Sequence, residues 1–335
     1  MRPREGVFVS WVSSHGRSHD LADALGLREV NYPRWVAAQP RALRYVAAAF
    51  ATLAMLVRTR PSAVVVMSPP PLPVFLCAAY CLITRRPLVV DAHSGAFNRP
   101  AWRRLSRLSL RMAQRCRPSA VVVTNDEMRA EAASWVGTEV IQLHDLLLPV
   151  TLPSVTDDSC DVFVVSSWAD DEPLATLGAA VSRLPGLRVV ISGRPPSEQR
   201  RRELEAAGIV VPGFLPDEDY LRMLSGAGVI VALTTRAGTM QRGGYEAASV
   251  GKALVTSDTR VLRDYFRDAA VFTPDEPTAL AAAITTALAG RRELESAMRS
   301  LRDQRLAEQD AGLQQLRRLL HRDGDARASN DGPVR

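Results

Sequence analysis

Residues 239–258 have the sequence TMQRGGYEAASVGKALVTSD, which predicts a glycine-containing loop, a short helix and a buried strand in that order. We expect residues 241–245 to form the loop and residues 245–250 the helix, with Gly251 as its end. Residues 253–256 then enter an apolar strand. A loop that leads into a helix presents backbone N–H groups without intrahelical partners, at the positive end of the helix dipole. The stretch therefore predicts an α/β unit with an anion-binding loop.

The polar side chains of this stretch suit a nucleotide sugar. Arg242 carries a planar donor fork for a phosphate, and Glu246, expected in the first helical turn, can accept hydrogen bonds from sugar hydroxyls. A diphosphate next to a ribose is the outline of a nucleotide-sugar site. The other candidate binding residues of the stretch are Thr239, Gln241, Gly243, Gly244 and Tyr245. The alternative is an ordinary loop and helix of an α/β domain.

The composition is that of a globular protein. The chain has 335 residues, of which 47% are hydrophobic and 23% charged, and this length is enough for two α/β domains. Its cysteines, at positions 77, 81, 116 and 160, form no CxxC pair, so we expect neither a metal site nor a disulfide framework, and we expect a reducing cytoplasm. No stretch has the length of a signal-peptide core at the N-terminus or of a membrane span elsewhere.

Short runs rich in valine and isoleucine alternate with helical segments along the chain, which predicts parallel sheets covered by helices on both faces. We expect two doubly wound, Rossmann-like domains that face each other across a cleft. Residues 1–150 form the first, 151–160 a proline-containing linker, 161–295 the second, 296–322 a charged helix, and 323–335 a disordered tail. The expected strands are 7–12, 63–67, 88–91, 120–124 and 140–143, followed by 162–166, 188–192, 210–212, 229–233, 254–256 and 270–272.

Residues 239–258 also resemble the C-terminal donor-site motif of the two-domain GT-B glycosyltransferases, especially the family 4-like (group 1) enzymes. The matching residues are Glu246, Ala247, Ala248, Gly251, Lys252 and Val255. In that motif the glutamate at the start of the helix binds the nucleotide ribose, so the resemblance implies this role for Glu246. It also implies that the helix at 296–322 crosses back to the first domain.

Two features depart from the family pattern. The family usually has a second glutamate eight positions before the first, near the donor sugar, where this chain has Gly238. Many relatives also carry a basic pair after the first strand of the second domain, where this chain has Trp168, Asp170, Asp171 and Glu172. We therefore expect the phosphate charge to be met by Arg242, Arg194 or Lys252. The donor sugar, its base and the stereochemical course stay open.

The strongest signal of the first domain is the loop DAHSGAF, residues 91–97. Ligands of doubly wound sheets bind beyond the carboxyl ends of the strands, and Asp91 ends an expected strand two residues before His93. A carboxylate and an imidazole at this place suit proton transfer near neutral pH. The passage resembles the D-x-H-x-G loop of some bacterial polysaccharide glycosyltransferases, so His93 and Asp91 are the candidate catalytic residues. The alternative is a capping role for Asp91 and a satisfied polar role for His93.

Three further loops follow expected strands. In SSHGRSHD, Gly16 lets the backbone approach a phosphate or sugar, although His15, Arg17 and His19 also suit a solvated turn. Gly193 and Arg194 follow the strand at 188–192 and suit the diphosphate. Phe214 and Leu215 resemble the family's base-contacting step. With the residues of 239–258, these complete the predicted nucleotide-sugar site.

Charge is divided unevenly along the chain. Residues 1–150 carry 19 arginines against 10 acidic residues, whereas the remainder is slightly acidic. Residues 41–60 and 72–86 are apolar segments with arginines at their ends. The simpler interpretation is two helices that pack on the first sheet. The alternative is a peripheral contact with an anionic membrane, which would bring a lipid-linked acceptor to the cleft.

The resemblance implies a metal-independent glycosyltransferase without a cofactor, which moves a sugar from a nucleotide-diphosphate donor to a saccharide or lipid-linked acceptor. Such an enzyme would serve cell-surface polysaccharide or glycoconjugate biosynthesis, in the cytoplasm or at the inner face of the cell membrane. Two alternatives are a nucleotide-sugar epimerase of similar fold and a non-catalytic relative that binds a nucleotide sugar. A nucleic-acid partner would explain the charge but not residues 239–258, and we expect none.

Overall fold

The computed structural model describes residues 5–12, 15–31, 34–38, 40–147 and 159–328. The chain forms two compact units, one of Met1–Leu146 with Glu308–Arg335 and one of Leu147–Ala307. Most of the expected linker lies outside the described residues, and its last residue, Cys160, already belongs to a strand.

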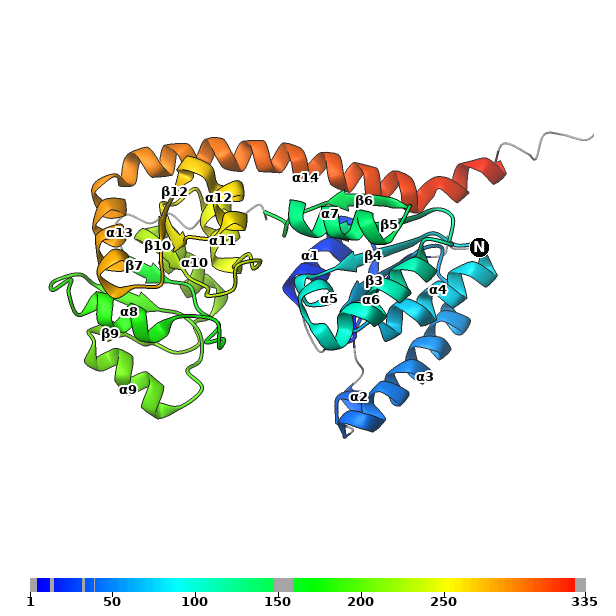
Figure 1. The fold of residues 1–335 in the computed structure, drawn as a ribbon, viewed down its shortest axis with the longest axis horizontal. Coiled ribbons are helices and arrows are strands. Elements are labelled where there is room, and N and C mark those ends of the chain that lie inside the picture. Colours follow the sequence, from blue (N-terminus) through cyan, green and yellow to red (C-terminus); the bar gives the residue numbers. More distant parts are fainter. Residues whose placement is uncertain (1–4, 13–14, 32–33, 39, 148–158, 329–335) are drawn as a thin grey trace, which may run out of the picture. The chain divides into compact units, whose positions relative to one another are not determined.

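The first unit contains a six-stranded parallel sheet with the order β2-β1-β3-β4-β5-β6 (Figure 1). Its strands are β1 (Val7–Val9), β2 (Arg28–Val30), β3 (Val64–Ser68), β4 (Leu88–Ala92), β5 (Ser119–Val123) and β6 (Glu139–Gln142). The strand order reverses between β1 and β3, and in open sheets of this kind the loops at such a reversal form the ligand site.

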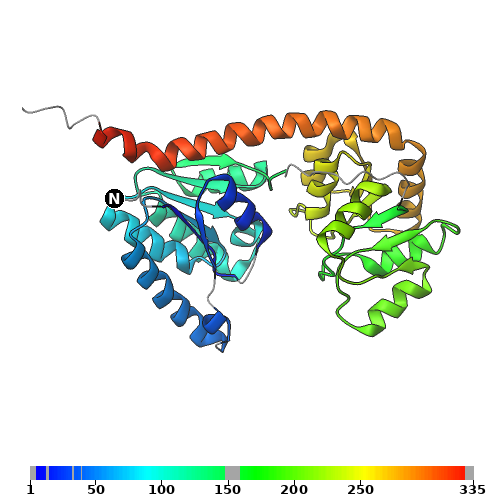
Figure 2. The ribbon, with the colours of Figure 1, turned by 180° about the vertical axis from the view of Figure 1, so that it is seen from behind.

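Helices cover both faces of this sheet because alternate strand residues point to opposite sides. The helices are α1 (Gly16–Ala24), α2 (Arg34–Ala37), α3 (Arg41–Thr59), α4 (Leu72–Thr84), α5 (Ser94–Asn98), α6 (Pro100–Ala113), α7 (Asp126–Trp135) and the end of α14 (Arg291–Ala328). Val7, Val9, Val64 and Val66 share one core with residues of α3, α4 and α6. Phe8 and Val65 share the other core with α1 and α14. Figure 2 shows the sheet from the side of α1, in dark blue.

The second unit repeats the architecture with a different strand order, β12-β11-β10-β7-β8-β9, again all parallel. Its strands are β7 (Cys160–Val164), β8 (Val189–Ile191), β9 (Ile209–Val210), β10 (Ala227–Ala232), β11 (Leu254–Ser257) and β12 (Ala270–Thr273). Its helices are α8 (Leu174–Val181), α9 (Glu198–Ala206), α10 (Asp217–Gly226), α11 (Arg242–Val250), α12 (Arg260–Phe266), the short 3₁₀ helix η1 (Arg267–Ala269) and α13 (Pro277–Ala289). The reversal of order here lies between β7 and β10.

Every strand expected from the sequence is present, with ends shifted by a few residues, and the fold class of two doubly wound units is confirmed. The strand β2 is missing from the prediction. Its sequence, Arg-Glu-Val, is short and partly exposed at the edge of the sheet, so it lacks the apolar run that marks a buried strand.

Helix α14 is longer than the expected helix at 296–322. It begins at Arg291 and continues to Ala328, so part of the tail expected to be disordered is helical. Met298 and Leu301 pack in the core of the second unit, whereas Leu313, Leu316, Leu319 and Leu320 pack in that of the first. None of the described helices is both long and apolar enough to cross a membrane.

A core contact at the far end of the chain predicts a stability effect. Leu316 is fully buried against the sheet of the first unit, so Leu316→Ala should lower the free energy of unfolding of that unit by about 2–5 kcal/mol. A urea titration followed by tryptophan fluorescence measures the loss. The matched control is Gln314→Ala on the exposed side of the same helix. Equal stability of the two variants would contradict this packing role.

Candidate functional site

The first cluster of polar residues lies where β1, β4 and β6 end, and its centre is a buried ion pair. The Arg17 guanidinium contacts Asp91, with Nη2 at 2.9 Å from Oδ1 and Nε at 3.1 and 3.2 Å from the two carboxylate oxygens. Arg17 also donates through Nη1 to Asp145 at 3.0 Å and through Nη2 to the carbonyl of Leu143 at 2.9 Å. Both Arg17 and Asp91 are almost completely buried. Asp91 is therefore a paired, hydrogen-bonded carboxylate rather than the cap of a turn.

His93 binds the same Asp91 carboxylate as Arg17 does. Its Nε2 lies 2.9 Å from Asp91 Oδ2, which orients the ring and leaves Nδ1 as the nitrogen that does not face the carboxylate. Burial alone would raise the pKa of Asp91, but the Arg17 guanidinium and His93 hold that pKa well below its usual range. The geometry is thus an aspartate that fixes a histidine while staying ionised, an arrangement suited to a general base.

A second histidine stands beside this dyad. The rings of His15 and His93 meet edge to face, with centroids 4.8 Å apart. Burial and the neighbouring His93 lower the pKa of His15, so this ring favours its neutral form. His15 is the N-cap of α1, and Gly16 is the exposed first residue of that helix. His19, in contrast, is exposed and bonds Glu29, which fits the solvated-turn alternative.

His15 and His93 line one cavity of about 540 Å³ in the first unit. Its other walls come from the residues after β1, β3 and α5, including Trp11, Pro69 and Arg99. The cavity thus opens at the carboxyl ends of β1 and β3, where the order of the strands reverses.

In the second unit, α11 begins at Arg242, earlier than the expected start at Tyr245. Glu246 therefore lies in the second helical turn rather than the first. Its carboxylate accepts a hydrogen bond from the Tyr220 hydroxyl at 2.5 Å and one from Arg242 Nε at 3.1 Å. Burial and the Glu246 carboxylate raise the pKa of Tyr220 well above its usual value, so this phenol stays a donor. Glu246 is thereby held in one place and remains partly exposed.

Three of the predicted binding residues face the protein core. A Cβ at Gly243 would lie 2.7 Å from Val165, and a Cβ at Gly244 would lie 2.8 Å from Phe266. Tyr245 is buried, and its ring packs edge to face on Tyr265 at 5.2 Å. The two glycines let α11 approach β10 and α12 closely, so what this first turn offers a ligand is its backbone N–H groups.

The loop between β10 and α11 is tied to the loop after β7. Asp171 accepts a hydrogen bond from Thr234 Oγ1 at 2.7 Å and pairs with Arg236 at 3.2 Å. Gln241 donates to the carbonyl of Leu233 at 2.9 Å, while Thr239 is partly exposed. Helix α8 starts after Pro173 without a side-chain cap, so Asp171 does not cap it. It joins the two loops at the strand reversal instead.

Glu172 occupies the inside of the loop after β7. Its carboxylate accepts hydrogen bonds from the backbone N–H groups of Ser167 and Trp168, at 3.0 and 3.2 Å, and from the hydroxyls of Ser166 and Ser167. Gly193 must be a glycine here, because its φ is +89° and a Cβ would lie 2.4 Å from the carbonyl of Ser166. The hydrogen-bond donors of this loop are therefore used by the carboxylate of Glu172, a residue of the same loop.

The remaining predicted residues are spread along neighbouring loops. Arg194 and Phe214 are exposed, Phe214 with 69% of its surface accessible, and Leu215 packs on the core of the unit. Lys252 does not reach a loop for phosphate, since it is buried and pairs with Glu295 of α14 at 3.0 Å. Of the three cations expected to meet a phosphate, Arg242 and Arg194 are the exposed ones.

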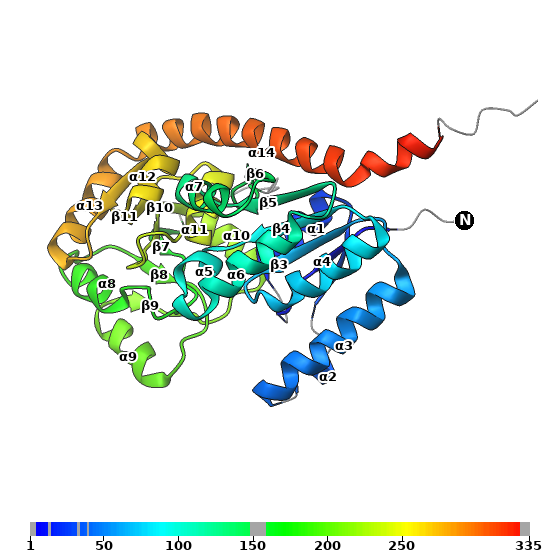
Figure 3. The same cartoon turned by 45° about the vertical axis from the view of Figure 1, so that its right-hand side comes forward.

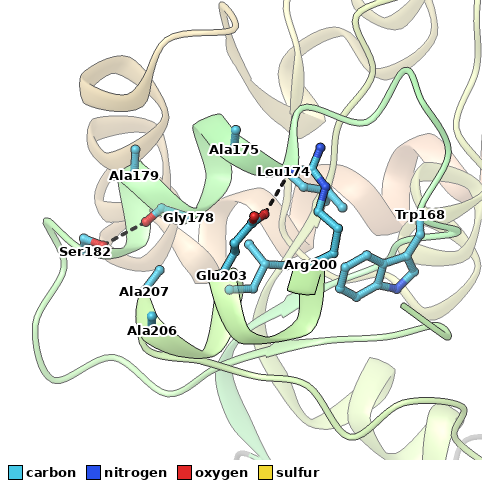
Figure 4. A pocket seen from close by; sticks show the side chains of 11 residues that line it. Trp168, Leu174, Ala175, Gly178, Ala179, Ser182, Arg200, Glu203, Ala206 and Ala207 are labelled. Carbon is cyan, nitrogen blue, oxygen red and sulfur yellow. Dashed lines mark hydrogen bonds and ion pairs between the residues drawn. The ribbon is translucent and has the colours of Figure 1, made fainter. Parts of the chain in front are cut away.

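A different cavity of the second unit, of about 360 Å³, lies between α8 and α9 (Figure 4). Small side chains such as Ala175 and Ala179 line it together with the Arg200–Glu203 pair and the Trp168 ring. It contains none of the residues predicted to bind the nucleotide sugar.

Comparisons with known proteins relate this architecture to a family model and to solved structures. Residues 174–290 match the family model described as Glycosyl transferases group 1. No curated protein matches the chain by sequence. The fold is similar to Anabaena Alr3699/HepE in complex with UDP-glucose, with a TM-score of 0.66 at 16% identity over 93% of this chain and 99% of that one.

Two more solved structures share the fold. Sucrose-phosphate synthase from Thermosynechococcus elongatus has a TM-score of 0.71 at 16% identity, over 96% of this chain and 100% of that one. The UDP-GlcNAc 2-epimerase from Methanocaldococcus jannaschii has a TM-score of 0.55 at 12% identity, over 84% and 91% of the two chains. The architecture is therefore the GT-B fold of two Rossmann-like units. Within this fold, residues 174–290 of the second unit match the group 1 glycosyltransferase family model.

Three contributors to these clusters escaped the sequence analysis. The sequence analysis named Arg17 in the loop after the first strand but did not predict its ion pair with Asp91. It did not predict any role for Asp145 or Tyr220. Each contacts a residue far away in the chain, so no local spacing could have revealed it.

The Arg17–Asp91 pair predicts a pH-dependent stability. Because the pKa of Asp91 is lower in the folded than in the unfolded chain, its carboxylate stabilises the fold above pH ~4, and this contribution is lost as the pH falls further. Asp91→Asn should cost up to about 3–5 kcal/mol at pH 7, since it leaves a buried guanidinium without its main partner. Urea titrations at pH 7, 5 and 3 measure the free energy of unfolding of the wild type and of Asp91→Asn. The difference between the two should shrink as the pH falls. A difference that stays constant would contradict this assignment.

Proposed function

We propose that the chain transfers a sugar from a UDP-sugar to a saccharide acceptor, with the donor held by the second unit. The observation that carries this proposal is Glu246, which is fixed by Tyr220 and Arg242 on the family-matched helix α11. A carboxylate held at that place suits the two hydroxyls of a ribose. Anabaena Alr3699/HepE, which shares the fold, has been crystallised with UDP and with UDP-glucose, which supports uridine as the base.

The donor diphosphate would meet the first turn of α11. Backbone N–H groups at a helix N-terminus and the exposed Arg242 and Arg194 stabilise negative charge, and this charge grows on the leaving diphosphate as the sugar departs. Phe214 is exposed after β9 and offers an aromatic face to the base. The proposal needs no cofactor other than the donor itself.

His93 would act as the general base on the acceptor. In the proposed step, the acceptor hydroxyl oxygen bonds the anomeric carbon, the bond from that carbon to the diphosphate breaks, and the hydroxyl proton passes to His93 Nδ1. Asp91 holds Nε2, so the ring is oriented before the reaction and the imidazolium that forms is stabilised.

Two variants separate binding from turnover. Glu246→Ala should weaken UDP affinity about tenfold or more, because hydrogen bonds to a charged group are lost, while the fold stays intact. His93→Ala should keep UDP affinity and lower turnover by about 10²- to 10⁴-fold. Thermal stabilisation by UDP and other nucleoside diphosphates measures binding, since a ligand at 100 times its dissociation constant adds ~2.7 kcal/mol.

Matched controls are Glu203→Ala on α9 and His19→Ala on α1, both exposed residues outside the two clusters. If Glu246→Ala binds UDP as well as the wild type, Glu246 is not part of the site. Wild-type turnover of His93→Ala would make that histidine structural.

An epimerase is the second candidate, because the UDP-GlcNAc 2-epimerase of Methanocaldococcus jannaschii has the same fold. An epimerase would change the sugar while it stays on the nucleotide, whereas a transferase releases UDP. Analysis of the nucleotide products with and without an acceptor therefore distinguishes the two reactions.

We further propose a lipid-linked acceptor and a peripheral membrane contact, consistent with a role in cell-surface polysaccharide assembly. Residues 30–125 contain fourteen arginines and one acidic residue, the buried Asp91. Within this stretch α3, α4 and α6 lie side by side over one face of the sheet (Figure 3). Leu43, Val46, Phe50, Leu53 and Val57 form an exposed apolar stripe along α3.

The neighbouring helices add to this surface. Ile83 of α4 is 83% exposed and Leu108 of α6 is 56% exposed. Arg104 and Arg107 on α6 are exposed, and α6 has no acidic residue in its first turn. Apolar side chains with arginines around them suit the interface of an anionic bilayer, where each cation near the surface contributes about 1 kcal/mol.

Vesicle binding tests this surface. The double variant Phe50→Asp/Leu53→Asp should lose sedimentation with phosphatidylglycerol-containing vesicles, because it places two carboxylates in the apolar stripe. Wild type should bind these vesicles and not neutral phosphatidylcholine vesicles. The control, Gln199→Asp, adds negative charge to the exposed face of α9. Equal binding of wild type to both kinds of vesicle, or unchanged binding of the double variant, would contradict the proposal.

A further inference from the structure

We infer that the cavity of the first unit binds a saccharide that carries a phosphate group, and that Arg44, Arg99 and an aromatic wall select it. This inference rests on the proposed function, since it names the chemical class of the acceptor that the transferase uses. The cavity measures about 540 Å³, within the usual range of small-molecule sites. It opens at the strand reversal of a doubly wound sheet, where such sites form.

One wall of the cavity is aromatic. The rings of Trp11 and Tyr45 lie 6.1 Å apart, and those of Tyr45 and Trp102 lie 6.4 Å apart, so three rings follow one another, one from the residues after β1, one from α3 and one from α6. Trp11 is held in place by a hydrogen bond from Nε1 to Thr52 Oγ1 at 2.9 Å. Aromatic faces pack well on the C–H faces of a sugar ring, and a fixed ring loses little entropy when the sugar binds.

The charged groups of the cavity are of one sign. Arg44 and Arg99 line it, and none of the described residues in its wall is acidic. Asp91, which lies behind His93, is already paired with Arg17. Arginines in the lining of such a cavity suit a multiply charged anion, because a guanidinium matches the geometry of phosphate oxygens.

The N-terminus of α6 adds to the positive potential of the cavity near Arg99. Arg99 is the N-cap of α6, a helix with no side-chain cap and no acidic residue in its first turn, so the positive end of its dipole is not neutralised there. Gly95 packs closely on Pro69, since a Cβ there would lie 3.0 Å from the proline ring, and Arg99 Nε lies in ordinary contact distance of the same position. Arg99 itself is exposed and forms no ion pair with another described residue.

The cavity also contains the proposed base. Because His93 lies in the same wall as Arg99, a bound sugar phosphate would place its hydroxyl groups beside the imidazole while the guanidinium groups bind the phosphate. The phosphate would then fix which end of the saccharide is glycosylated. A lipid diphosphate and a soluble sugar phosphate offer the same group to these arginines.

Binding of glucose 1-phosphate to the full chain tests the inference. Quenching of tryptophan fluorescence reports the cavity through Trp11 and Trp102, and saturating UDP keeps the ligand out of the donor site. Glucose 1-phosphate should bind at least about tenfold more tightly than glucose. Arg99→Ala should remove most of this difference, since a hydrogen bond to a charged group is worth about tenfold or more. Arg104→Ala, an exposed arginine of the same helix, should change affinity by less than about twofold.

Transfer assays then distinguish the two sources of phosphate. A glucose linked through diphosphate to an isoprenyl chain in detergent micelles is compared with glucose 1-phosphate as the acceptor. A preference of the wild type for the lipid that Arg99→Ala lowers assigns the lipid-linked source, and equal use assigns the soluble one. Either result supports the inference.

Two results would overturn it. One is equal affinity for glucose and glucose 1-phosphate, and the other is an equal effect of Arg99→Ala and Arg104→Ala. UDP affinity, measured on the same samples, separates this failure from a failure of the donor site. If UDP binds through Glu246 while glucose 1-phosphate does not bind, only the acceptor class is wrong.

Discussion

The first unit depends on one buried ion pair. Arg17 comes from α1, Asp91 from the end of β4, and the remaining partners of the guanidinium, Asp145 and the Leu143 carbonyl, from the chain just after β6. The pair therefore joins three separate segments at the edge of the sheet where ligands bind. Its two charges are costly to bury, and they are tolerated because nearly every polar atom of the pair has a partner. The ionised carboxylate that results is also what orients His93.

The second unit uses carboxylates differently at the corresponding edge. Asp171 connects the loops after β7 and β10, and Glu172 satisfies backbone and hydroxyl donors within its own loop. The acidic residues after β7 thus stabilise loops. In the proposed donor site, positive charge for a phosphate comes from exposed arginines and from the N-terminus of α11, which the close packing of Gly243 and Gly244 sets against the sheet.

Local patterns in the sequence predicted the candidate residues of these two clusters. Asp91 and His93 were recognised because a carboxylate and an imidazole directly follow a buried strand, and Glu246 because its surroundings resemble a donor-site motif. The partners that give these residues their properties were not predictable in the same way. Arg17 is distant from Asp91 in the chain, and Tyr220 is distant from Glu246, so only the folded chain brings them together. The sequence also did not predict which way each side chain points. Tyr245 and Lys252, for example, are buried in the protein.

The sequence alone determined the two doubly wound sheets, since runs of valine and isoleucine between helices have few other ways to bury their apolar side chains. It also determined which loops lie at the carboxyl ends of the strands, because the polypeptide direction is shared by all strands of a parallel sheet. The tertiary structure decided the order of the strands, and with it that the ends of β1, β3 and β4 surround one cavity. Strand order depends on pairing between distant segments, and the alternation of strands and helices is equally compatible with several orders.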